Sequence, residues 1–83
     1  MLDPQIIRLL IREKLQGGRL PRDSAPKALG LPGNREKCDA CDEILTAAAL
    51  MMEIYPLTND MKIVRFHGDC YLLWNEEIRL PQS

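Results

Sequence analysis

The chain has few of the residues from which most catalytic and nucleic-acid-binding sites are built. Its 83 residues include one histidine, one tryptophan and one phenylalanine, and aromatic residues make up only 5 %. Lysine and arginine number 11 against 12 aspartate and glutamate, so the formal net charge of −1 excludes a polycation of the histone kind. The 46 % hydrophobic content and the 28 % charged content exclude a disordered chain.

Long apolar runs are also absent. No run approaches the about 20 residues that a helix needs to cross a bilayer. The chain begins Met1-Leu2-Asp3, without the cationic start of a secretory signal peptide. We therefore expect a cytoplasmic protein that has no membrane partner.

The length of the chain predicts a single domain over residues 1–83 with a marginal hydrophobic core. A domain of this size buries only roughly 60 % of the surface of its unfolded chain, and small domains commonly add a disulfide or a metal ion. Three cysteines are an odd number. An odd number in a cytoplasmic chain fits a disulfide framework poorly and a metal site well.

The cysteines and the histidine form two pairs with metal-ligand spacing. Cys38 and Cys41 make a Cys-x-x-Cys pair, and His67 and Cys70 make a His-x-x-Cys pair. Three thiolates and one imidazole suit tetrahedral Zn²⁺, and such a filled site leaves no position for a substrate. We expect structural zinc. The alternatives are iron, three buried free thiols, or a redox dithiol at Cys38 and Cys41.

The N-terminal residues 3–16 are predicted to be a helix. Asp3 is a good N-cap and Pro4 suits the first helical position, while the two glycines after residue 16 favour its end. Large aliphatic residues recur on one side. Their stripe is wide enough to cover the chain's own core or to contact a partner, and the proposed interface residues are Ile6, Ile7, Leu10 and Ile11.

The remaining elements are predicted from turn residues and alternation. Glycine and proline recur throughout residues 17–37, which we interpret as a long loop. Residues 47–55 and 62–67 alternate as the strands of a hairpin, and residues 69–79 suit a helix. The predicted fold class is therefore α+β: an N-terminal helix, a long loop, and a zinc module over 38–80 built from a hairpin and a helix.

This order of turn, hairpin and ligand-bearing helix resembles a treble-clef zinc finger. It is similar to the first half of LIM domains and to the fingers of poly(ADP-ribose) polymerases, although 25 residues between Cys41 and His67 are slightly long for a LIM finger. Residues 17–80 also resemble a group of short, uncharacterised bacterial proteins. The resemblance implies a metal-binding fold without naming an activity. Asp42 stands where a treble-clef turn usually has glycine, which puts the turn geometry in doubt.

These patterns predict a non-catalytic zinc-stabilised module that binds a protein partner or a second copy. No nucleophile lies beside a base in the sequence. The adjacent Glu76 and Glu77 are interpreted as exposed acidic surface rather than as a catalytic pair. We therefore expect neither an enzymatic activity nor a small-molecule substrate. The alternative is nucleic-acid binding, because the first 37 residues have eight basic and four acidic residues. Its candidate residues are Arg19, Arg22, Lys27, Arg35 and Lys37. A thiol redox protein ranks third.

Overall fold

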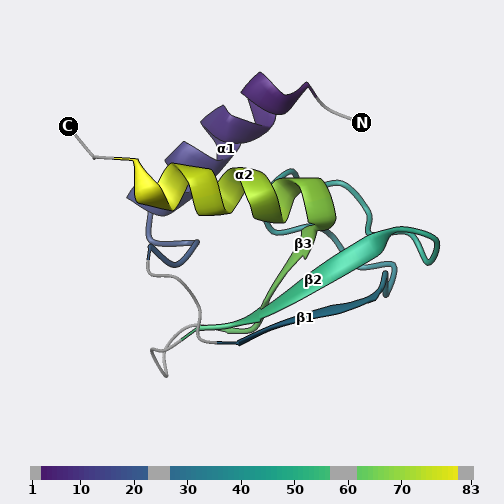
Figure 1. Cartoon of the computed structure of the whole chain (residues 1–83). Coiled ribbons are helices and arrows are strands. Elements are labelled where there is room, and N and C mark those ends of the chain that lie inside the picture. Colours follow the sequence, from purple (N-terminus) through teal and green to yellow (C-terminus); the bar gives the residue numbers. More distant parts are fainter. Residues whose placement is uncertain (1–2, 23–26, 57–61, 81–83) are drawn as a thin grey trace.

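The computed structural model describes residues 3–22, 27–56 and 62–80 as a small α+β fold (Figure 1). The elements in chain order are helix α1 (Pro4–Gln16), strands β1 (Lys27–Pro32), β2 (Leu50–Tyr55) and β3 (Val64–His67), and helix α2 (Gly68–Arg79). The strands form an antiparallel sheet in the order β1-β2-β3. Helix α2 packs on β2 and β3, and α1 packs on α2. The predicted fold class is confirmed.

Helix α1 begins and ends where the sequence predicts. The carboxylate of Asp3 accepts a hydrogen bond of 2.8 Å from the backbone N–H of Gln5, and Pro4 occupies the first turn, where a missing N–H costs nothing. After the last helical residue, Gly18 takes a left-handed conformation with φ of 74°. That conformation lets the chain turn away from the helix axis without the steric cost of a Cβ.

The prediction of an unbroken loop over residues 17–37 is wrong. Within it, β1 pairs with β2 from Lys27 opposite Tyr55 to Pro32 opposite Leu50. The segment has no hydrophobic alternation because five of its six residues are exposed. Its strand conformation is decided by the partner strand rather than by local sequence.

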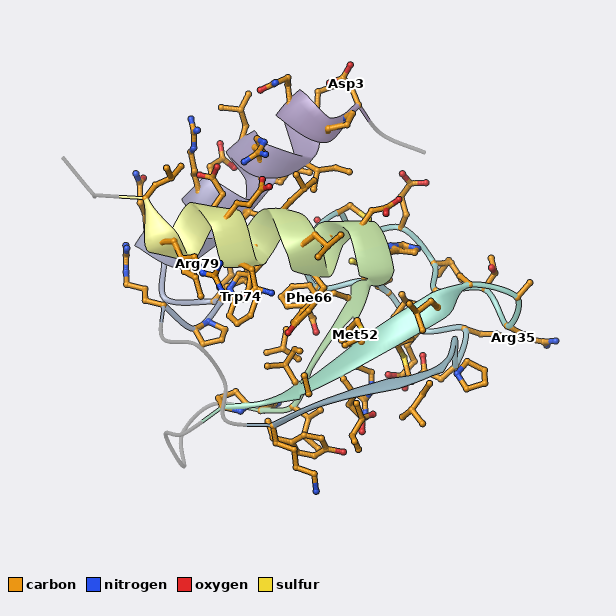
Figure 2. All side chains as sticks on the ribbon, viewed as in Figure 1. Asp3, Arg35, Met52, Phe66, Trp74 and Arg79 are labelled. Carbon is orange, nitrogen blue, oxygen red and sulfur yellow. The ribbon has the colours of Figure 1, made fainter. Side chains whose placement is uncertain are left out.

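The core is built from both helices and the sheet, and its largest members are Phe66 and Trp74 (Figure 2). Their ring centroids are 5.3 Å apart, and both side chains are fully buried, as expected of core aromatics rather than of a surface for stacking bases. The indole N–H of Trp74 donates to the carbonyl of Pro21 over 3.0 Å. This bond ties the segment after α1 to α2.

The interpretation of Glu77 as exposed acidic surface is also wrong. Its side chain is only 1 % exposed, because it lies between α2 and α1. Arg12 donates to it over 2.6 Å and Arg8 over 2.9 Å, and these bonds, with that of Arg12 the stronger, lower the pKa of the Glu77 carboxyl. Glu76, in contrast, is exposed and pairs with Arg8 at the surface. A buried carboxylate is costly unless its cationic partners are in place. The contacts of Glu77 therefore fix how α1 packs on α2.

No helix in the described part of the chain is long and apolar enough to cross a membrane.

Gly33 occupies the tightest backbone position after β1. Its N–H donates to the carbonyl of Ala49 over 3.0 Å, which closes the connection between β1 and β2. A Cβ at this position would lie 1.9 Å from the carbonyl oxygen of Thr46 and 2.6 Å from that of Leu45. These are backbone atoms, so a side chain here would displace the chain that leads into β2.

We expect Gly33→Ala to lower the free energy of unfolding by about 3 kcal/mol through this overpacking. Gly30→Ala is the matched control, because a Cβ at Gly30 meets only side-chain atoms at 3.5 Å and beyond. The control should change stability by less than about 1 kcal/mol. Urea unfolding of both variants at one fixed zinc concentration measures the difference, and equal stability of the two would contradict the close approach at Gly33.

Candidate metal centre

The first pair of candidate ligands lies on a tight turn, residues 38–42, which we call the cysteine turn. The backbone N–H of Asp42 donates to the carbonyl of Cys38 over 2.9 Å, and the N–H of Cys38 donates to the carbonyl of Glu43 over 2.8 Å. A bridge between Lys37 and Ile44 closes the base of the turn. The turn therefore presents Cys38 and Cys41 from a rigid backbone.

The second pair comes from the junction of β3 and α2. His67 is the last residue of β3, and Cys70 lies in the first turn of α2. Two hydrogen bonds of 2.8 Å attach the cysteine turn to this strand: the N–H of Asp39 donates to the carbonyl of Arg65, and the N–H of Arg65 donates to the carboxylate of Asp39. The sheet thereby places the turn beside the start of α2.

Together the four side chains form a set of donors that fits one metal ion. Their donor atoms all lie within 4.8 Å of one another. Nδ1 of His67 is 3.4 Å from Sγ of Cys41 and 4.0 Å from Sγ of Cys70. A tetrahedral zinc ion with Zn–S near 2.3 Å and Zn–N near 2.0 Å has edges of about 3.5–3.8 Å. The arrangement is therefore compatible with tetrahedral coordination of one ion.

The imidazole of His67 is held in the orientation that a metal ligand needs. Its Nε2 lies 3.2 Å from the carbonyl oxygen of Ile44, which can only accept a hydrogen bond. A proton on Nε2 leaves the lone pair of Nδ1 directed at the thiols. Metal-bound histidines commonly use such an outer hydrogen bond to fix their tautomer.

The electrostatics of the thiol cluster favour a bound cation. A hydrogen bond from the thiol of Cys70 lowers the pKa of Cys38 to about 4, with help from the backbone N–H groups of Cys41, His67 and Ala40. The same bond raises the pKa of Cys70, and burial raises that of Cys41. A divalent cation among the three sulfur atoms would compensate the negative charge of their thiolate forms.

Asp42 has a left-handed backbone conformation, with a φ of 64°. Aspartate is one of the residues that tolerate this region. Its carboxylate also lies 2.8 Å from the ammonium of Lys14 on α1. Asp42 thus adopts a backbone conformation usually reserved for glycine and adds an ion pair.

The predicted nucleic-acid residues do not gather on one surface. Arg19 and Arg22 follow α1, whereas Arg35 and Lys37 precede the cysteine turn at the other end of β1. Figure 2 shows Arg35 at the tip of the molecule that is farthest from the end of α2. Lys27, at the start of β1, lies over the ring of Tyr55 at 5.3 Å from its centroid.

The predicted interface residues are divided between the core and the surface. Ile7 and Ile11 are buried in the chain's own core, Leu10 is partly buried, and Ile6 is exposed. The buried part of the stripe therefore packs within the fold, whereas Ile6 and Leu9 at its edge stay exposed. Sequence reasoning missed Lys14, whose side chain is buried against the cysteine turn, because a lysine on a helix normally indicates a solvated face.

Comparisons with protein-family models, with curated proteins and with solved structures found no match to this chain. The chemistry of the site therefore rests on its own residues.

We expect Asp42→Val to destabilise the protein by about 1–2 kcal/mol more than Asp42→Asn, because a β-branched residue resists the left-handed conformation that asparagine tolerates. Thermal unfolding of both variants with bound zinc measures the difference. Asp42→Asn also removes the charge that faces Lys14, so it separates the ion pair from the backbone. Equal losses in the two variants would show that the charge, not the conformation, selects this residue.

Proposed function

We propose that the chain is a non-catalytic zinc module in which one Zn²⁺ bound by Cys38, Cys41, His67 and Cys70 holds the cysteine turn against α2. The observation that carries this proposal is the convergence of the four donor atoms within 4.8 Å. Three soft thiolates with one imidazole favour zinc over calcium or magnesium. Four protein ligands fill a tetrahedron, which supports a structural rather than a catalytic ion.

The arrangement around the site supports the treble-clef interpretation. A ligand-bearing turn is followed by the hairpin of β2 and β3 and then by a helix whose start carries the last two ligands. Strand β1 is an addition on the outer edge of β2. In such a small domain the free energy of zinc binding, on the order of 10 kcal/mol for structural sites, adds directly to folding.

The zinc proposal predicts one zinc ion per purified chain. Cys41→Ser and His67→Ala should each remove a ligand and lose both the ion and most of the secondary structure, because the metal contributes to folding. Elemental mass spectrometry on protein of known concentration, with circular dichroism alongside, measures both effects. Glu13→Gln, an exposed change on α1, is the control and should retain the metal.

Two results would overturn the zinc proposal. Bound iron in place of zinc would correct the identity of the metal. A folded, metal-free protein that reversibly forms a disulfide between Cys38 and Cys41 would instead favour a redox dithiol.

For the partner we propose a second copy of the chain, bound through the surface where α1 and α2 meet. A hollow of about 360 Å³ opens between their N-terminal halves, with Ile7, Leu72 and Leu73 among its lining residues. Leu72 is 60 % exposed beside it. A projecting leucine and an apolar hollow on one face, with Arg8 and Asp69 supplying both charge signs at the rim, suit an isologous interface.

This partner proposal predicts concentration-dependent dimerisation of the zinc-loaded protein. Leu72→Asp should weaken dimerisation at least tenfold, because it places a charge in the buried interface. Leu50→Asp is the matched control, since Leu50 is equally exposed, at 57 %, but lies on β2. Sedimentation equilibrium measures the dissociation constants. A monomer at every concentration would overturn the dimer and leave the zinc proposal intact.

Nucleic-acid binding has less support from the geometry. The five basic residues lie in separate places along the molecule, whereas phosphate recognition gains its affinity from cations gathered on one face.

A further inference from the structure

Lys14 makes the only buried ammonium contact to the cysteine turn within the described residues. Its side chain is 6 % exposed, although lysine in the last turn of a helix is usually solvated. Its Nζ donates to the carbonyl of Asp39 over 2.9 Å, to the carbonyl of Ala40 over 3.0 Å and to the carboxylate of Asp42 over 2.8 Å. All three N–H donors of the ammonium are therefore used.

Each carbonyl that Lys14 contacts is one end of a peptide group in the cysteine turn. The carbonyl of Asp39 shares a peptide group with the N–H of Ala40, and the carbonyl of Ala40 shares one with the N–H of Cys41. Hydrogen bonding from both N–H groups contributes to the lowered pKa of Cys38. A cation at the oxygen end of a peptide polarises its N–H, which strengthens the bond at the other end.

We propose that Lys14 is a positioning residue for the metal, acting from α1 through these two carbonyls to hold the cysteine turn that presents Cys38 and Cys41. This inference rests on the proposed zinc site and deepens it. Outer hydrogen bonds of this kind tune the affinity of metal sites. Because coupling is reciprocal, metal binding also stabilises the packing of α1 on the cysteine turn.

The charges of the site are consistent with this role. One Zn²⁺ with three thiolates and a neutral imidazole has a net charge of −1. The ammonium of Lys14 contacts the same turn and supplies a positive charge. A buried ammonium is costly unless it is paired, and here Asp42 and the two carbonyls compensate it.

The test compares the zinc affinity of Lys14→Met with that of two controls. Methionine keeps the length and the buried apolar stem of the side chain but donates no hydrogen bond. Asp42→Asn removes the negative partner and leaves the carbonyl contacts in place. Ile11→Val loosens the packing of α1 without touching the cysteine turn.

We expect Lys14→Met to lose about 10–100-fold in zinc affinity, measured by competition with a chelator. Ile11→Val should stay within about threefold of the unmodified protein, and Asp42→Asn, which keeps both carbonyl contacts of Lys14, should lose less than Lys14→Met. With Co²⁺ in the site, the thiolate-to-cobalt charge-transfer band should move to lower energy in Lys14→Met alone, because a thiolate with weaker hydrogen bonds gives up charge more readily. The zinc affinity of Lys14→Gln, which retains one donor group, should lie between that of Lys14→Met and that of the unmodified protein. Lys14→Gln replaces Lys14→Met in the test if Lys14→Met does not fold.

A zinc affinity and a cobalt band in Lys14→Met equal to those of Ile11→Val would overturn this inference and assign Lys14 to the packing of α1. Such a result would leave the zinc site standing. If the unmodified protein binds no zinc, the proposed function itself fails, so the two failures are distinguishable.

Discussion

The arrangement of this fold depends on four side chains from two distant segments meeting at one point. Twenty-five residues separate Cys41 from His67, and the antiparallel pairing of β2 with β3 brings the cysteine turn to the start of α2. The two hydrogen bonds between Asp39 and Arg65 fix that contact through the backbone. Because thiols crowded in this way resist simultaneous ionisation, a bound cation would stabilise this geometry.

The two helices are held to the rest of the molecule by buried charges as well as by apolar packing. Glu77 joins α2 to α1 through Arg8 and Arg12, and Lys14 joins α1 to the cysteine turn. Each contact pairs a buried charge on one element with groups on a second element, so it forms only when both elements are in place. Helix α1 is therefore part of the surroundings of the candidate metal centre and not a separate appendage.

Local chemistry explains why much of the fold could be predicted. Asp3 and Pro4 define a helix start through capping and a fixed φ, which need no tertiary partner. The strand at 64–67 is rich in branched and aromatic residues, and its burial alternates as expected. Strand β1 was missed because Gly30 and Pro32 are poor strand residues, and its pairing with β2 supplies the stability that its own sequence does not.

The sequence by itself determined the donor set, since ligand type and spacing follow from Cys38, Cys41, His67 and Cys70 alone. It also determined the helix boundaries and the α+β class, which depend on local propensity and period. Only the tertiary structure decided the environment of each charge. Lys14 and Glu77 have the same residue types as solvated surface positions, but packing between elements removes them from water and gives them specific partners. Burial is a property of the assembled fold, so no local pattern could have assigned their roles.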